Sequence, residues 1–491
     1  MGALCPRFWE RRPAVADLGM GSVRLRLRDT PRGASNPGPL SPGPLPGPFR
    51  PPPRPPVSHA PDRRPVLAAG LRLPQARAGG RFSREDPAHL GAALLREFLA
   101  QLELDAGQLD EVIVGNVGAP HDQANVARVI ALRAGIPRHV PAFTVARNCA
   151  SGMQAVTSAM DRIQAGRGDL FLCLGVEVMS AYPLVFNERG RRFFQRLAAA
   201  RTPLAKAQAG LTLRPSAFAP RIALTEGLTD PISGLIMGST AELLAREFGI
   251  EREQADRYAL TSHVRAAVAR DGGRFQREIL PYLPFGSRPG EAALASDDGI
   301  RDNQTPEALA KLGPYFEKPD GVVTVGNACG ITDGATALLV TSAARARGLG
   351  LRPLAALRDY AWSGCDPARM GLGPVHASAK LLTAAGMRLG DIGAVELNEA
   401  FAVQVLACQQ AFASEAYCRD NLGAPGALGE IDPARLNKNG GAIALGHPVG
   451  ATGARLLLTT AHELAVSDCE LGLATLCIGG GQGGAVLLER L

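Results

Sequence analysis

The stretch Arg147-Asn148-Cys149-Ala150-Ser151-Gly152-Met153 decides how this chain is interpreted. It lies between a strand-like segment at 142–146 and a helix-like segment at 151–165. Cys149 therefore stands where a strand meets a helix, and the positive end of the helix dipole favours thiolate over thiol there. A thiolate in this position is a candidate nucleophile for covalent catalysis.

Two Gly-rich segments far downstream supply further groups that covalent catalysis uses. His447 follows Gly446 and precedes Pro448, in a loop that leads to a helix-like segment at 454–465. We interpret it as the base. Cys477 and Gly479 end a buried strand in a Gly-rich turn, whose exposed backbone N–H groups can form an oxyanion hole. A dinucleotide-binding loop is excluded because these glycines lead into another strand rather than a helix. A nucleophile, a base and a second thiol indicate acyl transfer.

Asn398 is a fourth candidate. It follows the strand-like segment 394–397 and precedes a helix-like segment at 402–412. A side-chain amide at a strand end can hold a water molecule or a substrate carbonyl. The alternative is a helix cap, a role that Asn often takes.

Strands and helices alternate along most of the chain from Arg64, which predicts an α/β fold with helices packed on sheets. The expected strands are 64–70, 111–114, 142–146, 170–175, 394–397, 471–476 and 485–488, and the expected helices are 88–102, 124–134, 151–165, 402–412 and 454–465. Cys149 and His447 are each followed by a Gly, a helix and a strand. We therefore expect two similar halves, each placing one reactive loop at a helix start.

Residues 183–310 interrupt this alternation. Helices are expected there at 240–248 and 252–270, and basic residues gather at Arg189, Arg191, Arg192 and Lys206. An insertion of this length is usually functional, although a plain surface excursion is the alternative.

The composition argues against a membrane-spanning protein, a nucleic-acid-binding protein and a metal site. The chain has 491 residues, 46% of them hydrophobic, yet no apolar run approaches the roughly 20 residues of a membrane span. Eleven Arg and four acidic residues give residues 1–65 a net charge of +7, which equals that of the whole chain. The remainder is neutral, so nothing suggests nucleic-acid binding. Nine scattered Cys without metal-ligand spacing indicate reduced thiols and no metal site.

Residues 1–63 are rich in Pro, Gly and Arg, which predicts a disordered extension. They lack the apolar core of a secretory signal. A misplaced start codon or an organelle transit peptide are the alternatives, and the density of Pro argues against an amphipathic transit helix.

Taken together, these motifs closely resemble those of the thiolase family. The shared stretches are Asn-Cys-Ala-Ser-Gly at 148–152, Asn-Glu-Ala-Phe-Ala at 398–402, Gly-Gly-Ala-Ile-Ala-Leu-Gly-His-Pro at 440–448 and Cys-Ile-Gly-Gly-Gly at 477–481. Further stretches at 237–242, 262–263 and 326–334 support the resemblance, which extends from about Arg64 to Leu491. It implies a five-layered αβαβα fold made of two βαβ-rich halves with an inserted loop domain. The implied boundaries are an extension at 1–63, an N-terminal half at 64–182 completed by 311–347, an insertion at 183–310 that binds CoA and the acyl group, and a C-terminal half at 348–491.

The resemblance also assigns roles to the site residues. It implies that Cys149 accepts the acyl group, that His447 takes its proton, and that Cys477 moves protons at the substrate α-carbon. It implies two oxyanion holes, one from His447 with a water molecule held by Asn398, the other from the amides of Cys149 and Gly479. No permanent cofactor is expected, and coenzyme A is a co-substrate.

The loop containing Cys329 and Gly330 is expected to contact CoA by the same resemblance. Many thiolases carry Ser at the position of Cys329, and Cys is the weaker hydrogen-bonding partner. Acetoacetyl-CoA thiolases often have His after the Pro at position 183, whereas this chain has Leu184. The segment 211–220 is similar to that of degradative thiolases paired with the fatty-acid oxidation multienzyme. Leu184 and the segment 211–220 both favour a longer, more apolar acyl group.

The resemblance therefore favours a 3-oxoacyl-CoA thiolase of fatty-acid β-oxidation. The alternatives are an acetoacetyl-CoA thiolase that condenses two acetyl-CoA, and a catalytically silent protein that binds acyl-CoA or lipid. A decarboxylating ketoacyl synthase would use a Cys-His-His set, which does not fit Asn398 and Cys477. A homodimer or homotetramer, or a hetero-oligomer with a hydratase/dehydrogenase subunit, is expected. The expected location is the cytoplasm, or the mitochondrion if residues 1–63 are a transit peptide.

Overall fold

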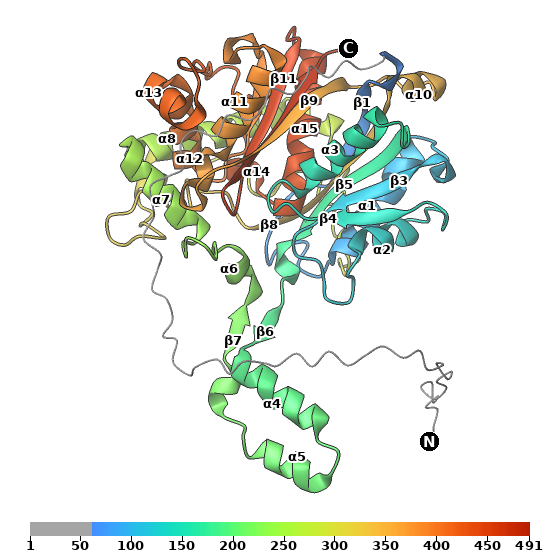
Figure 1. The fold of residues 1–491 in the computed structure, drawn as a ribbon, viewed down its shortest axis with the longest axis vertical. Coiled ribbons are helices and arrows are strands. Elements are labelled where there is room, and N and C mark those ends of the chain that lie inside the picture. The colour runs from blue at the N-terminus through green and yellow to red at the C-terminus, as the bar shows by residue number, and fades with distance from the viewer. Residues whose placement is uncertain (1–60) are drawn as a thin grey trace, which may run out of the picture. The chain divides into compact units, whose positions relative to one another are not determined.

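The structure, a computed structural model, describes residues 61–491, and most of its strands join one large mixed sheet (Figure 1). The N-terminal half contributes β1 (Pro65–Arg72), β2 (Ala76–Arg77), β3 (Glu111–Gly115), β4 (Ala142–Val145), β5 (Leu170–Val178) and β8 (Thr332–Ser342). The C-terminal half contributes β9 (Ala355–Gly364), β10 (Ala394–Leu397), β11 (Leu471–Ile478) and β12 (Gln482–Glu489). Their order is β10-β11-β12-β9-β1-β8-β5-β3-β4, with β2 paired to β8.

The two halves repeat one pairing scheme, as the sequence predicts. In the first half, β3 pairs with β5 in parallel, β5 pairs with β8 antiparallel, and β8 pairs with β1 antiparallel. In the second, β10 is parallel to β11, which is antiparallel to β12, which is antiparallel to β9. The β4 strand before Cys149 has a counterpart in Leu436, which forms a parallel bridge with Val395 before His447. The halves meet where β1 pairs with β9.

Helices complete the layers (Figure 1). They are α1 (Pro87–Gln101), α2 (Val126–Arg133), α3 (Ser151–Gln164), α10 (Ala343–Gly348), α11 (Gly373–Ala385), α12 (Ala402–Ala413), α13 (Glu415–Tyr417), α14 (Ala442–Leu445) and α15 (Val449–Val466). The α3 and α15 helices share one buried cluster with strands of both halves, represented by Met153, Leu457, Leu338 and Leu476. The α1 and α2 helices cover one outer face, and α11 and α12 the other. The five layers are α1 with α2, the strands of the N-terminal half, α3 with α15, the strands of the C-terminal half, and α11 with α12. This is the predicted five-layered α/β architecture.

Glycines let the two central helices approach closely at their N-terminal ends. A Cβ atom on Gly152 would lie 2.8 Å from the carbonyl oxygen of Gly450, and one on Gly453 would lie 2.6 Å from the amide of Met153. Any side chain at these positions would push the helices apart. The loops that precede α3 and α15 therefore lie at the same end of the central layer.

Most expected elements fall within a few residues of the observed ones, and α15 is the main exception. It begins at Val449, five residues before the expected start at 454. Its first five residues include two glycines, which have low helix propensity, and it is buried on all sides, so periodicity alone misses its start. The correction places His447 just before the first turn of the helix.

The insertion contains α4 (Glu188–Ala199), α5 (Pro203–Gly210), α6 (Ala223–Gly227), α7 (Met237–Phe248), α8 (Arg252–Asp271), α9 (Pro306–Ala310), β6 (Leu184–Phe186) and β7 (Pro220–Ile222). The two helices that the sequence predicts in the insertion, at 240–248 and 252–270, correspond to α7 and α8. Residues 184–222 form what we call the arm: β6 and β7 pair as a narrow ribbon, with α4 and α5 at its end (Figure 1). The elements that contact α4 most extensively are α5, β6 and the 3-10 turn Pro215–Phe218, all within the arm.

The predicted extension lies almost wholly outside the described residues. Its last three residues, Pro61–Arg63, already form a 3-10 turn, and the Arg63 guanidinium donates to the carbonyl of Ile163 at 2.8 Å. The described part of the chain thus includes the last three residues of the predicted extension. Within residues 61–491 we find no helix that combines the length and the apolar character needed to cross a bilayer.

Candidate active site

The Cys149 loop is a tight turn tied to the opposite half of the molecule. Asn148 adopts a positive φ of 44°, a conformation that Asn tolerates better than most residues. The hydroxyl of Ser151 donates to the carbonyl of Asn148 at 2.8 Å and accepts from the amide of Arg147 at 2.8 Å. The Asn148 side-chain amide donates to the carbonyl of Gly479 at 2.8 Å. The loop before α3 and the turn after β11 are thereby held together.

The sulfur of Cys149 faces two backbone amides in a buried site. Burial raises the pKa of the Cys149 thiol, whereas N–H groups of Gly479 and of Cys149 itself, directed at the sulfur, lower it, and Glu177 raises it further. The net direction is upward, so the expectation of a resting thiolate is wrong. Removal from water outweighs the two amides. Cys149 is a thiol at rest and needs a base to become a nucleophile.

His447 has the geometry of that base. Its Nδ1 lies 2.6 Å from the hydroxyl oxygen of Thr452, and that hydroxyl donates to the carbonyl of Pro448 at 3.0 Å. Since the Thr452 hydrogen is engaged, we assign the ring hydrogen to Nδ1 and the free lone pair to Nε2. Nε2 is buried and has no partner among the described residues. Burial, together with the charge of Arg455, lowers the pKa of His447 to about 3, so the ring is neutral at physiological pH and Nε2 carries a free lone pair.

Asn398 and Cys477 lie at the ends of neighbouring parallel strands. The amide of Asn398 donates to the carbonyl of Thr475 at 3.0 Å, which aligns the end of β10 with the end of β11. Both side-chain polar atoms of Asn398 are buried, and neither finds a partner in residues 61–491. Buried polar atoms are rarely left unpaired, so these are available to a substrate or water molecule. The helix-cap alternative fails because the cap position of α12 is Phe401.

Cys477 is a deeply buried thiol beside the nucleophile. Its side chain is 1% exposed, and burial raises its pKa well above the ordinary value, with Cys149 the next largest contribution. The turn that follows supplies the amide of Gly479 to the sulfur of Cys149. One short segment of the C-terminal half thus carries both a second thiol and a hydrogen-bond donor for the nucleophile.

Cys329 and Gly330 occupy a loop beside these residues. The amide of Cys329 donates to the carbonyl of Ala400 at 3.0 Å, which ties the loop to the segment after Asn398. Burial raises the pKa of Cys329 to about 12, and the charge of Cys149 raises it further. The structure brings Cys329 to the site, and its contact with CoA stays a prediction.

Two buried carboxylates that sequence reasoning missed hold the reactive loops. Glu177 on β5 accepts from the amides of Val117 at 3.0 Å, Gly118 at 2.9 Å and Gly450 at 3.1 Å. Burial raises its pKa to about 7, although these amides oppose the shift. The sequence did contain a signal that could have identified Glu177, because it is a charged residue within an otherwise apolar strand.

Glu399 is the second missed carboxylate. It accepts from the hydroxyls of Ser262 at 2.6 Å and Tyr258 at 3.0 Å, from the side chain of Asn437 at 2.9 Å and from the amide of Ile443 at 3.3 Å. These contacts fix the Gly-rich segment that precedes His447. Its position next to Asn398 was visible in the sequence, but its partners were not.

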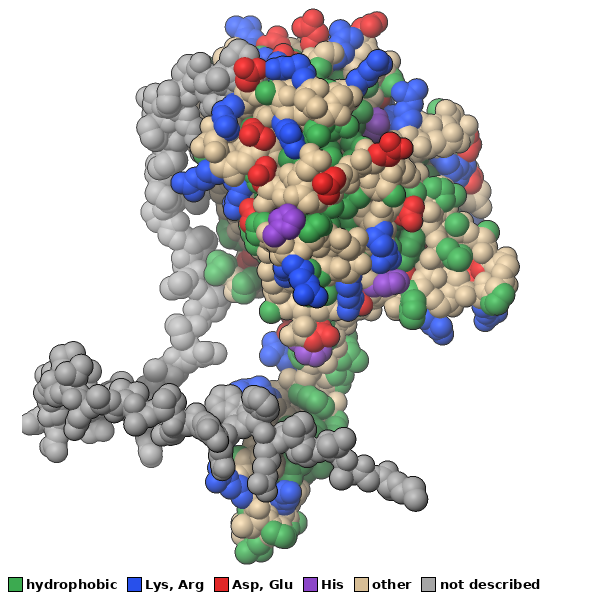
Figure 2. Space-filling view, turned by 90° about the vertical axis from the view of Figure 1, so that its right-hand side faces the viewer, with side chains coloured by type: hydrophobic (Ala, Val, Ile, Leu, Met, Phe, Trp, Pro, Cys, Tyr) green, Lys and Arg blue, Asp and Glu red, His purple; other side chains and the backbone are tan. Residues whose placement is uncertain are grey.

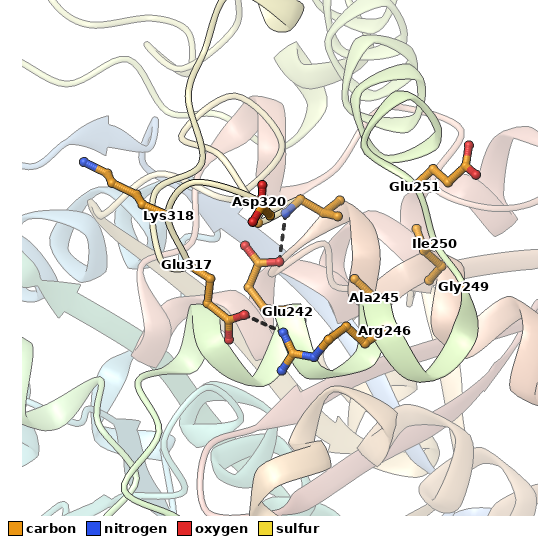
Figure 3. Close-up of a pocket in the computed structure, with 11 residues that line it drawn as sticks. Glu242, Ala245, Arg246, Gly249, Ile250, Glu251, Glu317, Lys318 and Asp320 are labelled. Carbon is orange, nitrogen blue, oxygen red and sulfur yellow. Dashed lines mark hydrogen bonds and ion pairs between the residues drawn. The ribbon is translucent and has the colours of Figure 1, made fainter.

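Two other sets of charged residues lie apart from this cluster. Arg189, Arg191, Arg192 and Lys206, the basic residues noted in the insertion, belong to the arm, whose helices pack mainly among themselves. Figure 2 shows hydrophobic and basic side chains together at the end of the arm. A cavity of about 510 Å³ opens beside α7, and Figure 3 shows that charged side chains line it. The carboxylates on its walls are Glu242, Glu251, Glu317 and Asp320. They outnumber the two cationic side chains of the lining, Arg246 and Lys318, which disfavours a phosphate, and none of the predicted site residues lines this cavity.

Comparisons with known proteins agree with the site. The chain matches the family described as Thiolase, N-terminal domain over residues 66–344, and Thiolase, C-terminal domain over residues 351–490. It is 43% identical over 402 residues to an acetyl-CoA acetyltransferase of Pseudomonas aeruginosa, covering 82% of this chain and 93% of that protein. It is 38% identical over 413 residues to a probable acetyl-CoA acyltransferase of Staphylococcus aureus, covering 84% and 95%.

Comparison with solved structures finds similarity to the same family of proteins. The Bacillus anthracis acetyl-CoA acetyltransferase matches with a TM-score of 0.76 and 36% identity, covering 87% of this chain and 99% of that one. Human mitochondrial 3-ketoacyl-CoA thiolase in complex with CoA matches with a TM-score of 0.75 and 33% identity, covering 88% and 100%. The chain therefore belongs to the thiolase family and is an acyltransferase of that family.

Proposed function

We propose that this protein is a 3-oxoacyl-CoA thiolase, which cleaves 3-oxoacyl-CoA with CoA into acetyl-CoA and a shortened acyl-CoA in fatty-acid β-oxidation. The observation that carries the proposal is the hydrogen bond of 2.8 Å from the Asn148 side chain to the carbonyl of Gly479, which brings the amides of Cys149 and Gly479 together at the Cys149 sulfur, whose pKa both of them lower. An oxyanion formed next to that sulfur would meet the same two donors. They come from opposite halves, so the hole exists only in the folded molecule.

The first half-reaction forms a thioester on Cys149. Nε2 of His447 takes the thiol proton as the sulfur attacks the 3-oxo carbon, and the oxygen becomes an oxyanion held by the amides of Cys149 and Gly479. The oxyanion collapses and the bond between C2 and C3 breaks. The electron pair leaves with acetyl-CoA as an enolate, whose oxygen faces protonated His447 and a water molecule held by Asn398.

A proton from Cys477 then completes acetyl-CoA. The raised pKa of this buried thiol supports the role, because the thiol holds its proton until a carbanion forms beside it. The Cys477 thiolate next removes the proton of incoming CoA. The CoA sulfur attacks the thioester on Cys149 and leaves as the shortened acyl-CoA, while the departing Cys149 thiolate takes the proton back from Nε2 of His447. Cys477 has kept the proton of CoA, so both resting thiols are restored.

CoA is proposed to bind across the loop of Cys329 and Gly330, which adjoins the Asn398 segment. We also propose assembly as a homodimer or homotetramer, or with a hydratase/dehydrogenase subunit. A human thiolase of similar fold has been solved with CoA, which supports the choice of ligand.

Chain length separates this proposal from its main alternative. The relatives named acetyl-CoA acetyltransferase favour an enzyme that condenses two acetyl-CoA. The experiment compares thiolysis of 3-oxoacyl-CoA with four and with sixteen carbons by the purified chain. We expect both to be cleaved, the longer at a kcat/KM at least equal to that of the shorter. Activity confined to the four-carbon substrate would support the acetoacetyl-CoA thiolase, and no thiolysis at all would support a silent acyl-CoA-binding protein.

A further inference from the structure

Arg147 lies two residues before Cys149, and its side chain joins the two halves of the molecule. Its Nε donates to the side-chain oxygen of Gln154 at 2.7 Å, and its Nη1 donates to that of Gln482 at 3.1 Å. The guanidinium also lies over the ring of Trp362, 4.3 Å from its centroid. Gln154 belongs to α3, whereas Gln482 and Trp362 belong to β12 and β9 of the C-terminal half.

The partners of Arg147 carry no charge. Burial lowers the pKa of Arg147, and Tyr360 opposes the shift. Two amide oxygens and an indole ring therefore hold a guanidinium that no carboxylate among the described residues pairs with. Packing alone does not account for this group, since an aliphatic side chain of similar length would fill the space without the cost of removing a charge from water.

The contact with Gln482 reaches the turn that carries an oxyanion-hole amide. Gln482 begins β12 directly after the turn 479–481. Asn148 donates to the carbonyl of Gly479 at the start of this turn, and Arg147 donates to Gln482 at its end. Two consecutive residues of the nucleophile loop thus hold both ends of the same turn.

The turn needs support from outside because it consists of three glycines. Gly480 and Gly481 adopt positive φ values of 87° and 74°. Glycine loses more conformational freedom on ordering than any other residue, so the turn has little rigidity of its own. The amide of Cys365 donates to the carbonyl of Gly481 at 2.7 Å, and the nucleophile loop supplies the other contacts. These contacts decide where the Gly479 amide lies.

Trp362 gives the guanidinium a fixed surface to stack on. It pairs with Gly484 between β9 and β12, and a Cβ on Gly484 would lie 2.3 Å from the indole ring. The ring therefore occupies space above the backbone of β12 that only glycine leaves free. A planar guanidinium can stack its face on this ring while its edge donates to two acceptors, which a Lys ammonium cannot do.

We propose that Arg147 is a positioning residue for the oxyanion hole: stacked on Trp362, it holds Gln482 and so fixes the Gly479 amide at the acyl carbon. An oxyanion donor is effective only within a few tenths of an ångström of its place, so a loosened turn would stabilise the transition state less. The inference rests on the oxyanion hole of the proposed function and is independent of the acyl chain length.

The first test measures thiolysis of a four-carbon 3-oxoacyl-CoA by the full chain. Arg147→Met keeps the aliphatic length but removes the donors and the charge, and kcat should fall about tenfold or more while the KM for CoA changes less than about twofold. Arg147→Lys keeps only the charge and should recover little of this loss. A raised KM for CoA with unchanged kcat would assign Arg147 to CoA binding and overturn the proposal, as would full activity of Arg147→Lys.

A second readout requires no turnover. Iodoacetamide alkylates Cys149 without forming an oxyanion, and peptide mass spectrometry follows the rate at this residue against pH. Because the Gly479 amide lowers the pKa of Cys149, its displacement in Arg147→Met should move the alkylation profile to higher pH. An unchanged profile would overturn the proposal. A wild type that is alkylated but cleaves no 3-oxoacyl-CoA would count against the proposed function, and the alkylation profiles would still decide this inference.

Arg162, at the other end of α3, offers a matched control. Its guanidinium lies 4.7 Å from the ring centroid of Phe143 and pairs with Glu111 at 2.9 Å. Arg162→Met thus removes a stacked guanidinium of the same kind and should leave kcat and the alkylation profile unchanged. Thermal unfolding midpoints verify that both Met variants are folded.

The role of the ring has its own variants. Trp362→Phe keeps an aromatic face and should retain most of kcat, whereas Trp362→Leu should reproduce much of the loss in Arg147→Met. Combined in one chain, Trp362→Leu and Arg147→Met should lower kcat little more than either alone, because both remove the same contact. Losses that multiply would show that the two residues act separately and would overturn the proposed arrangement.

Discussion

The carboxylate of Glu177 accepts a hydrogen bond of 3.1 Å from the backbone amide of Gly450, 273 positions away in the chain. Glu177 ends the buried strand of one half, and Gly450 lies in the first turn of the helix that follows His447 in the other half. The same carboxylate accepts from the amides of Val117 and Gly118. A single fully buried side chain therefore positions the start of α15 relative to the N-terminal sheet.

Replacement Glu177→Gln should destabilise the protein in a way that depends on pH. The pKa of Glu177 is about 7 in the folded state, against roughly 4.3 for an unfolded Glu. Between these values the folded state holds more protons, so the stabilisation from Glu177 is complete below pH about 4.3 and declines as pH rises through 7. The difference in unfolding free energy between wild type and variant should fall by up to about 1.4 kcal/mol per pH unit in this window.

Denaturant unfolding between pH 4.5 and 8 measures this slope. Glu253→Gln, which makes the same change at an exposed position of α8, is the control. A pH-independent difference for Glu177→Gln would contradict the raised pKa.

Replacement Thr452→Val should slow acylation. Valine keeps the shape but removes the oxygen that holds Nδ1–H of His447, so the ring loses its fixed tautomer and orientation. We expect kcat to fall at least about tenfold, with a stability loss of only about 1 kcal/mol. Thr452→Ser keeps the hydroxyl and should restore most of the activity; an inactive Ser variant would show that the methyl group matters instead.

Replacement Cys149→Ala should abolish the acyl-enzyme. Intact-protein mass spectrometry after incubation with acetyl-CoA should show an acetyl adduct on wild type and none on the variant, with turnover reduced at least about a thousandfold. Cys469→Ala is the matched control, since Cys469 has similar intermediate exposure and packs against Gly393, before the start of β10. Unchanged turnover in Cys149→Ala would refute its assignment as the nucleophile.

Replacement Cys477→Ala should separate the two half-reactions. Acetylation of Cys149 by acetyl-CoA should survive, because the base His447 is intact. Condensation of two acetyl-CoA should fall by about a hundredfold or more, since no group is left to remove the α-proton. Full condensation activity would contradict this role, and loss of the adduct would place Cys477 in the first step instead.

Replacement Cys329→Ser should tighten CoA binding. A hydroxyl donates a stronger hydrogen bond than a thiol, so the KM for CoA should fall by about two- to fivefold while kcat changes little. Cys469→Ser, at another partly exposed thiol, is the control. A KM unaffected by Cys329→Ser would remove this residue from the CoA site.

The reactive residues themselves could be found in the sequence. Cys149, His447 and Cys477 each lie in a short Gly-containing segment at the end of a strand or the start of a helix, and such segments are local in the chain. The alternation of strands and helices was readable for the same reason, because backbone periodicity depends on neighbouring residues. The chemistry of acyl transfer and the two-half α/β fold were therefore visible before any tertiary contact was known.

Only the tertiary structure decided the protonation states and the positions of these groups. Sequence reasoning expected a thiolate at Cys149, whereas burial among residues of both halves keeps it a thiol. The lone pair on His447 Nε2 follows from its contact with Thr452, and the position of α15 depends on Glu177. Removal from water and long-range hydrogen bonding involve residues hundreds of positions apart, and no local pattern encodes them. The same holds for the arm, whose apolar residues could have formed a core and instead lie exposed among basic side chains.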